Sequence, residues 1–216
     1  MKKKILLIAI IAFTALYSFA QQEKQRVLSE CTVDYIVDIS EAVGLDNSLS
    51  ETFKATTKTV YIKGNQSRVD FKSPSFSQSV IYDKKTGDAV ILREIGGNKF
   101  LTNINADSWK KKNGSLDNAT VQTLEETKTI LGYDCKKAVL TLADGTSLHL
   151  FYVPNFVPSV KEFEYQFKNV PGFVLEYESQ DKNGQKIKYT ATKINLNPVS
   201  TTKFDIPTSG YRILNE

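Results

Sequence analysis

A hydrophobic pattern with a period of two repeats along most of the chain and leaves few folds open to it. Between residues 31 and 39 every odd position is apolar, while most of the even positions are polar. Such alternation is typical of a β-strand with one buried face. Similar segments follow in series, and several are separated by turn sequences such as Gly64-Asn65 and Asp144-Gly145. Gly and Asn accept the positive φ of tight hairpins, so the pattern predicts consecutive antiparallel strands.

Eleven segments have this strand-like pattern, and no segment has a long 3.6-residue period, a tandem repeat or a linker composition. They are residues 31–39, 58–63, 67–72, 79–82, 89–94, 99–104, 123–130, 134–142, 146–153, 172–178 and 186–195. We expect a mainly β fold: a single curved antiparallel sheet, or half-barrel, of about 10–11 strands with few short helices.

Three further segments lack the strand pattern. Residues 41–55 read as a loop with one helical turn, and residues 105–119 are polar and irregular. Residues 154–170 carry two prolines and an alternating apolar set at Phe163, Tyr165 and Phe167. With so few helix candidates, we expect the concave face of the sheet to be only partly filled, which would leave an apolar pocket.

The N-terminus has the pattern of a secretory signal peptide. Lys2, Lys3 and Lys4 precede an apolar run from residue 5 to residue 17, and Ser18-Phe19-Ala20 has small residues at positions −3 and −1 of a cleavage site. The apolar run is shorter than the roughly 20 residues of a membrane-spanning helix. We therefore expect residues 1–20 to be removed, leaving one domain at residues 21–216 in the periplasm or outside the cell, with no transmembrane segment.

The charge of the chain follows largely from this segment. Without its three lysines, 25 Lys and Arg stand against 24 Asp and Glu, where the whole chain has 28 against 24. A mature domain so close to neutrality has no charge excess with which to attract a polyanion. We expect no nucleic-acid partner.

The two cysteines, Cys31 and Cys135, allow two interpretations. The exported compartment permits a disulfide, and closing a loop of this length would stabilise the fold by about 4–5 kcal/mol. The alternative is two buried thiols on separate strands. We carry the disulfide forward as the expectation.

Two segments resemble the GLPGLI family of exported proteins. Residues 130–138 read I-L-G-Y-D-C-K-K-A and are similar to the family's I-x-G-Y-x-C-x-K-A segment, while residues 170–176 read V-P-G-F-V-L-E and are similar to its naming motif. The motif positions carried over are Gly132, Tyr133, Cys135, Pro171 and Gly172. The family's arginine and tryptophan after the intervening turn are absent, since Thr146 and Phe151 or Tyr152 stand there. Both motifs also read as backbone signals, because Gly and Pro mark turns.

The meander and the closing F-x-I-P-x-x-G-Y segment, residues 204–211, resemble the periplasmic lipoprotein-carrier (LolA-like) fold more broadly. The resemblance implies a half-barrel of antiparallel strands with helices at its mouth, sheltering acyl chains.

Catalytic and metal-binding patterns are scarce. His149 is the single histidine, and one His with two distant Cys cannot form the common zinc sets. No Walker, nucleophile-elbow, zincin or EF-hand motif occurs. Asp34 and Asp38 on one strand face read as a solvated face more readily than as a catalytic carboxylate pair. We expect no enzymatic activity, no metal and no cofactor.

One aromatic and basic stretch allows two interpretations. Trp109 precedes Lys110, Lys111 and Lys112. The stretch is either an interfacial foot that rests on lipid headgroups or a solvated charge run beside one buried Trp.

These features predict a periplasmic, non-catalytic protein that binds a lipid or a lipoprotein acyl chain in the concave face. The alternative is an interaction module with a solid core that docks on an envelope or outer-membrane protein. Aromatic residues in strand-like segments are the candidate lining residues: Tyr35, Phe71, Tyr82, Phe151, Phe163, Phe167 and Phe173.

Overall fold

The computed structural model describes residues 25–39, 51, 55–180 and 186–214 of the chain. The signal peptide expected at residues 1–20 and nearly all of the loop expected at residues 41–55 lie outside these ranges. Within them, twelve strands form one sheet in the order β14-β7-β6-β5-β4-β3-β2-β13-β12-β10-β9-β8. The strands are β2 (Glu30–Ile39), β3 (Thr57–Lys63), β4 (Gln66–Lys72), β5 (Phe76–Asp83), β6 (Ala89–Ile95), β7 (Asn98–Ile104), β8 (Thr120–Ile130), β9 (Tyr133–Thr141), β10 (Ser147–Val153), β12 (Phe173–Gln180), β13 (Lys186–Asn195) and β14 (Arg212–Leu214).

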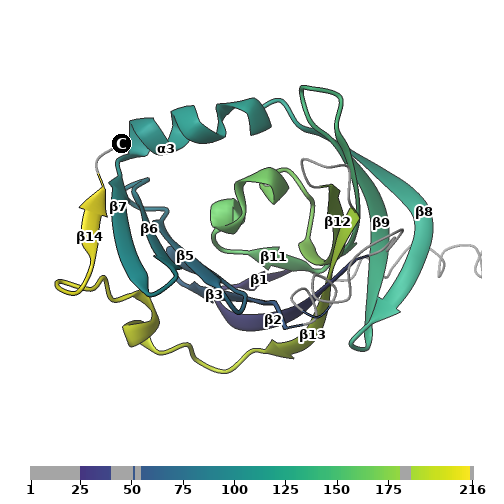
Figure 1. Cartoon of the computed structure of the whole chain (residues 1–216). Coiled ribbons are helices and arrows are strands. Elements are labelled where there is room, and N and C mark those ends of the chain that lie inside the picture. Colours follow the sequence, from purple (N-terminus) through teal and green to yellow (C-terminus); the bar gives the residue numbers. More distant parts are fainter. Residues whose placement is uncertain (1–24, 40–50, 52–54, 181–185, 215–216) are drawn as a thin grey trace, which may run out of the picture.

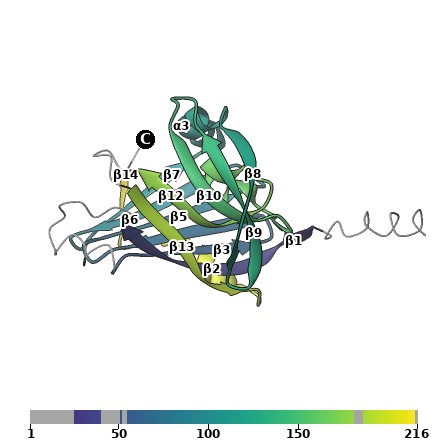
Figure 2. The same ribbon diagram turned by 90° about the vertical axis from the view of Figure 1, so that its right-hand side faces the viewer.

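The sheet curves into a half-barrel that does not close (Figure 1). Neighbouring strands are antiparallel, except that the short β14 runs parallel to β7. The register follows the hydrophobic alternation: Val60 of β3 pairs with Val33 on one side and with Val69 on the other. Figure 2 shows the wall of β8, β9, β10 and β12 in front of the wall that contains β3 and β5. The predicted mainly β half-barrel is confirmed.

Two further strands, β1 (Arg26–Leu28) and β11 (Phe156–Pro158), form a separate parallel pair. From β11 the chain enters the half-barrel and forms two short 3-10 helices, η3 (Lys161–Phe163) and η4 (Tyr165–Phe167), which Figure 1 shows inside the curve of the sheet. Val160, Phe163, Phe167 and Val170 of this segment are buried in the core, so their side chains fill part of the concave side.

The helix α3 (Ala106–Asn113) lies across the open mouth between β7 and β8, followed by η2 (Gly114–Leu116) (Figure 1). The expectation that residues 105–119 are irregular is therefore wrong for residues 106–116, which form α3 and η2. Asn105 caps it by accepting a hydrogen bond from the Ser108 backbone nitrogen at 2.9 Å. Asp107 in its first turn and three lysines in its last turn complement the helix dipole. No residue of α3 is fully buried, so the helix lacks the apolar period by which sequence patterns reveal helices.

The core lies mainly inside the half-barrel, in two adjoining clusters. The first includes Tyr35, Val60, Ile62, Ile91, Ile104, Phe163, Phe173 and Leu175. The second includes Leu140, Leu148, Leu150, Phe167, Val174 and Tyr177. A smaller cluster covers the outer face of β5, β6 and β7, where Val199 and Phe204, the latter in η5 (Thr201–Phe204), pack on the sheet.

The predicted disulfide is wrong in this structure: Cys31 and Cys135 are both buried free thiols. Cys31 lies on β2 and Cys135 on β9, and three strands, β13, β12 and β10, stand between these two in the sheet. Both side chains are fully buried in the same core cluster inside the half-barrel, and each remains a free thiol. The alternative of two buried thiols on separate strands is the one observed.

Among the described residues, none of the helices is both long enough and apolar enough to pass through a bilayer.

Candidate functional site

Residues 161–167, which contain η3 and η4, are called the 3-10 segment. A pocket of about 320 Å³ remains between the concave face of the sheet, α3 and the 3-10 segment inside the half-barrel. We call it the concave pocket. Its lining side chains come from the strands, from α3 and η2, and from η3 and η4: Lys58, Val69, Phe71, Gln78, Val80, Trp109, Asn113, Leu116, Phe163, Glu164, Tyr165, Gln166, Tyr177 and Tyr189.

The strand wall of the concave pocket follows from register and alternation. Val69 of β4 is directly opposite Val80 of β5, and Phe71 is directly opposite Gln78. Side chains two residues apart on a strand share a face, so these four side chains line one surface. The wall is therefore mostly apolar, with one amide at its edge.

An ion pair lies at the floor of the pocket. Lys58 of β3 is only 3% exposed, and its ammonium contacts the Glu164 carboxylate and donates a hydrogen bond of 3.0 Å to the Tyr177 hydroxyl. Two tyrosine rings flank the ammonium, with centroids 4.7 Å away in Tyr35 and Tyr177. A buried ammonium without such partners would be strongly disfavoured. These contacts hold the charge of Lys58 in place.

Burial dominates the titration of this cluster. It lowers the pKa of Lys58 below its ordinary value, although the Glu164 carboxylate acts in the opposite direction. Burial also raises the pKa of Tyr35 and of Tyr177 well above the ordinary value, and the Glu164 charge adds to both shifts. The tyrosines are therefore neutral hydrogen-bonding groups at physiological pH.

Trp109 forms part of the opposite wall. Its ring stacks on Tyr82 of β5 with centroids 5.9 Å apart and planes 28° apart. Its indole nitrogen Nε1 is buried, and no residue in the described part of the chain accepts its hydrogen bond. Lys110, Lys111 and Lys112 are exposed beside it. This arrangement favours a solvated charge run next to a packed Trp over an interfacial foot.

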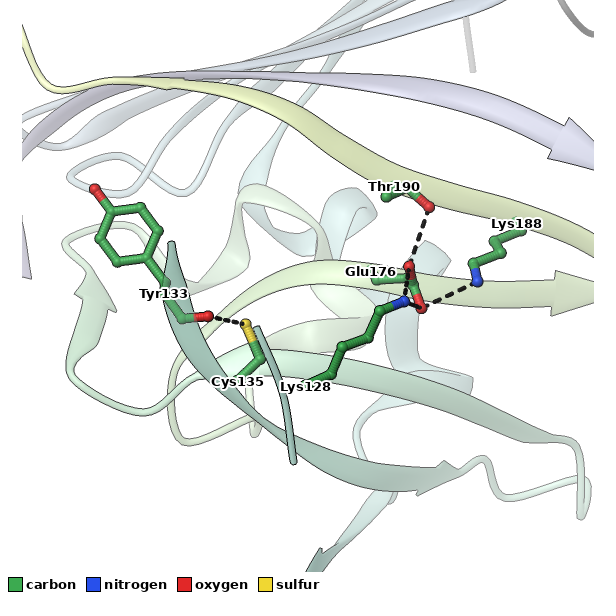
Figure 3. Close-up of polar contacts among 6 residues, drawn as sticks. All are labelled: Lys128, Tyr133, Cys135, Glu176, Lys188 and Thr190. Carbon is green, nitrogen blue, oxygen red and sulfur yellow. Dashed lines mark hydrogen bonds and ion pairs between the residues drawn. The ribbon is translucent and has the colours of Figure 1, made fainter. Parts of the chain in front are cut away.

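A second pocket, of about 480 Å³, is more polar and is formed by β8, β9, β10, β12 and β13. At its centre the Glu176 carboxylate is 5% exposed and accepts hydrogen bonds from Lys128 at 2.8 and 2.9 Å and from Thr190 at 3.3 Å. Lys188 contacts it at 3.1 Å, as Figure 3 shows. Glu176 precedes Tyr177 on β12, and Tyr177 lines the concave pocket. The Glu176 side chain therefore points to the opposite face of the sheet from the Tyr177 side chain. The carboxylate ties three strands together, because its partners lie on β8 and β13.

The predicted aromatic lining residues separate into three groups. Phe71 and Phe163 line the concave pocket, and Phe151 lines the second pocket. The other four are packed in the core: Tyr35, Tyr82, Phe167 and Phe173. Phe163 stacks on Phe173 with centroids 5.2 Å apart, and Phe167 packs edge-on against Tyr177. The 3-10 segment occupies part of the concave face, so most of the predicted aromatic residues pack in the core and do not line a pocket.

The motif residues act mainly on the backbone. Leu131 and Gly132, with φ of 54° and 81°, form the tight turn between β8 and β9. Gly172 packs against β10, since a Cβ there would stand 2.3 Å from the Val153 carbonyl oxygen. Tyr133 packs edge-on against Phe156, with centroids 4.8 Å apart. Neither Gly132, Gly172 nor Pro171 lines the concave pocket.

Sequence reasoning missed the residues that give the concave pocket its polarity. Lys58 stands at a buried position of β3, in phase with Val60 and Ile62, and a lysine in that phase is a sign of a buried charge. Nothing local pointed to Glu164, which is 106 residues away from Lys58.

His149 is exposed at the second pocket. No group of three or more His, Cys, Asp and Glu side chains within the described ranges is arranged to hold a metal ion.

No protein-family model matches the chain, and no curated protein matches it in sequence. The resemblance to the GLPGLI family therefore stays a prediction. Among solved structures the chain is similar to PNGF-II in two crystal forms, with 14% identity and a TM-score of 0.51 in one and 12% and 0.50 in the other. In both, 87% of the chain is covered, but the chain spans only about a third of PNGF-II, 31% and 32%. At this identity the likeness shows a shared fold alone.

Two further solved structures are similar to the chain with lower TM-scores. An uncharacterised conserved protein from Thermus thermophilus has a TM-score of 0.46 and 10% identity, over 88% of this chain and 91% of that one. The MucA/MucB complex of Pseudomonas aeruginosa has a TM-score of 0.43 and 11% identity, over 82% of this chain and 56% of that one. No conclusion about this chain's function follows from likenesses of this strength.

Proposed function

We propose that the protein is a non-catalytic binding protein of the bacterial periplasm that holds an apolar ligand, a lipid or a lipoprotein acyl chain, in the concave pocket. The observation that carries the proposal is the pocket itself: about 320 Å³ of space bounded by Val69, Phe71, Val80, Leu116 and Phe163. Ligand sites have volumes of about 300–1,000 Å³, mostly apolar walls and a few polar groups, and the concave pocket has this character.

The non-catalytic part of the proposal rests on the state of the ionisable groups. Lys58 and Glu164 are bonded to each other at the pocket floor. A general acid or base must lie within hydrogen-bond reach of the substrate group whose proton it moves, and the hydrogen bond of this pair is made within the protein. The pocket is better suited to hold a ligand than to transform one.

The test is to fill the pocket with a larger side chain. Val69→Phe places a ring in the concave pocket, whereas Val27→Phe makes the same change on β1, where Val27 is 62% exposed and away from the pocket. We expect the wild type and the control to bind the apolar dye N-phenyl-1-naphthylamine with enhanced dye fluorescence. Val69→Phe should weaken dye binding about tenfold or more, because overlap with the new ring removes buried ligand area.

Lipid extraction and native mass spectrometry of the purified wild type give an independent readout. A co-purifying lipid or acylated molecule supports the proposal. The absence of dye binding together with an empty extract would contradict it.

One observation favours a second candidate function, docking on an envelope protein. β8 is 11 residues long, most of its side chains are exposed, and among the described strands only β9 pairs with it. A free strand edge can accept a strand from a partner. A stoichiometric envelope protein bound to natively purified material that carries no lipid would favour docking over ligand binding.

A further inference from the structure

The second pocket, formed by β8, β9, β10, β12 and β13, is a separate site from the concave pocket. Of the described residues, Tyr177 alone lines both pockets. The second pocket has a volume of about 480 Å³, which is larger than the concave pocket and within the range of about 300–1,000 Å³ for ligand sites. The proposed function does not involve it.

The lining of the second pocket carries a small excess of positive charge. Its ionisable side chains are four lysines, three glutamates and one histidine: Lys128, Lys137, Lys186, Lys188, Glu126, Glu176, Glu178 and His149. Four positive charges against three negative charges leave an excess of one, even with His149 neutral. None of the described residues that line this pocket is an arginine. An excess of this size suits one small anion and not a polyanion.

The strand register gathers three of the ammonium groups at the centre of the pocket. Lys137 of β9 is directly opposite Phe151 of β10, and Phe151 is directly opposite Glu176 of β12. Directly opposite side chains share a face of the sheet. The ammonium nitrogens of Lys128 and Lys137 lie 5.5 and 5.8 Å from the centroid of the Phe151 ring. Figure 3 shows Lys128 and Lys188 on either side of the Glu176 carboxylate.

The buried Glu176 carboxylate does not use all the donors of these lysines. An ammonium group has three N–H donors. Lys128 makes two hydrogen bonds to Glu176, and Lys188 makes one contact with it at 3.1 Å. The two lysine side chains are 42% and 33% exposed, so their remaining donors are accessible from the pocket. Two positive charges here share one negative charge, and an anion beside them would be attracted.

The choice of lysine over arginine indicates what kind of anion fits. The planar guanidinium of arginine matches a planar carboxylate with two parallel hydrogen bonds, whereas an ammonium acts as a point charge. A tetrahedral phosphate group accepts hydrogen bonds from several directions, as ammonium groups on three different strands require. The Phe151 ring adds an apolar surface, and the pocket has room for an organic group beside the phosphate.

We propose that the second pocket binds the phosphate group of a phosphate monoester through Lys128, Lys137 and Lys188. The organic part of the ligand lies against Phe151. A soluble small molecule and a lipid headgroup present the same phosphate chemistry, so the two sources are separated by experiment. The inference goes beyond the proposed function and does not depend on it, because the two pockets are different.

The first experiment compares probes on the wild-type protein by calorimetry at about pH 7.5, where a phosphate monoester is mainly a dianion. Phenyl phosphate, benzoate and phenol share one ring and differ in the polar group. We expect phenyl phosphate to bind most tightly and phenol not to bind measurably, and added salt should weaken the binding of phenyl phosphate. Vesicles of phosphatidylcholine with and without phosphatidic acid test the lipid source.

Three variants locate the site. Lys188→Gln should weaken the binding of phenyl phosphate about tenfold, because a charge-assisted hydrogen bond is lost. Glu178→Gln removes a negative charge directly opposite Lys188 and should strengthen binding about threefold. Lys99→Gln is the matched control: Lys99 is 45% exposed and lies 4.0 Å from Glu94, outside the second pocket. It should leave binding unchanged.

The outcomes decide the proposal. Binding of phenyl phosphate or of the phosphatidic acid vesicles that Lys188→Gln weakens would support it, and the probe that binds identifies the source. No binding of either phosphate probe, or equal binding of benzoate and phenyl phosphate, would overturn it. The probe comparison and the gain in Glu178→Gln do not require Lys188→Gln to fold.

A competition experiment separates this proposal from the proposed function. Phenyl phosphate should not displace N-phenyl-1-naphthylamine, because the dye occupies the concave pocket. Displacement would place the phosphate in the concave pocket and overturn the inference. Binding of phenyl phosphate without any dye binding would support the inference and count against the proposed function.

Discussion

Lys58 and Glu164 form an ion pair that joins the middle of the sheet to the 3-10 segment inside the half-barrel. The two residues are 106 positions apart, and the contact fixes a segment with little regular structure of its own against β3. Tyr165 gives the same segment a second attachment, donating a hydrogen bond of 2.7 Å to Asp117 just after η2. The segment that occupies the half-barrel is thus held by polar contacts on two sides, and the concave pocket lies between them.

The first prediction concerns this pair. Lys58→Met should lower the free energy of unfolding by about 3 kcal/mol, because it leaves the Glu164 carboxylate without its buried partner. The double variant Lys58→Met with Glu164→Gln should regain most of that loss, since no uncompensated charge remains. Urea unfolding measures both. Lys63→Met is the control: Lys63 pairs with Glu30 at 3.1 Å, but both side chains are far more exposed. It should cost less than about 1 kcal/mol, and an equal cost at both sites would contradict the prediction.

The strands were predictable from the sequence because apolar and polar residues alternate locally along each of them. The eleven expected segments correspond to β2 to β10, β12 and β13, with shifts of a few residues at their ends. Each strand has one face that must be buried, so a period of two identifies it. The helix α3 escaped because no residue of it is fully buried, although Asn105, Asp107 and the lysine run are capping and dipole signals.

The pocket was less predictable, because it depends on contacts between distant segments. The alternation of Phe163, Tyr165 and Phe167 resembles a strand, but the segment forms two 3-10 turns inside the half-barrel. Choosing lining residues by aromatic character alone therefore selected core residues such as Phe173. The sequence indicates a buried lysine in β3, but it does not identify the ion partner Glu164. The lysine alone therefore predicts a buried charge and does not locate a site.

The second prediction concerns acid stability. Burial raises the pKa of Glu176, but hydrogen bonds from Lys128 and Lys188 more than offset this, and the pKa lies below its ordinary value of 4.5. A carboxyl with a lowered folded-state pKa stabilises the protein above its unfolded-state pKa, and that stability is lost as the pH falls through the folded-state value. The wild type should therefore lose stability from about pH 4.5 downwards. Glu176→Gln should be less stable at pH 7 and should lose less on acidification.

Urea unfolding between pH 3 and pH 7 measures this dependence. Glu126→Gln is the control, because Glu126 is 56% exposed and its ion pair with Lys137, at 2.7 Å, lies at the surface. Its pH dependence should resemble that of the wild type. Parallel curves for Glu176→Gln and the wild type would show that Glu176 does not carry the effect.

The third prediction concerns Gly172 of the second motif. A Cβ at this position would lie 2.3 Å from the Val153 carbonyl oxygen and 2.5 Å from Tyr152 Cδ2, so β10 would have to move. Gly172→Ala should destabilise the protein by about 2–3 kcal/mol, a cost typical of overpacking. Gly114→Ala is the matched control, with helical φ and ψ and nothing within 4 Å of the added Cβ. Thermal unfolding should show it to be neutral or slightly stabilising. Equal melting temperatures for Gly172→Ala and the wild type would argue against a close approach.

The last prediction concerns the two thiols. Burial raises the pKa of Cys31 to about 12 and is the main reason that the pKa of Cys135 is raised to about 11. The thiolate is the reactive form, and both side chains are shielded from solvent, so neither should react with iodoacetamide at pH 8 while the protein is folded. In 6 M guanidinium without reductant both should be alkylated, and mass spectrometry should find two added groups. Full protection in the denaturant, with alkylation only after reduction, would show instead that the exported protein joins Cys31 to Cys135.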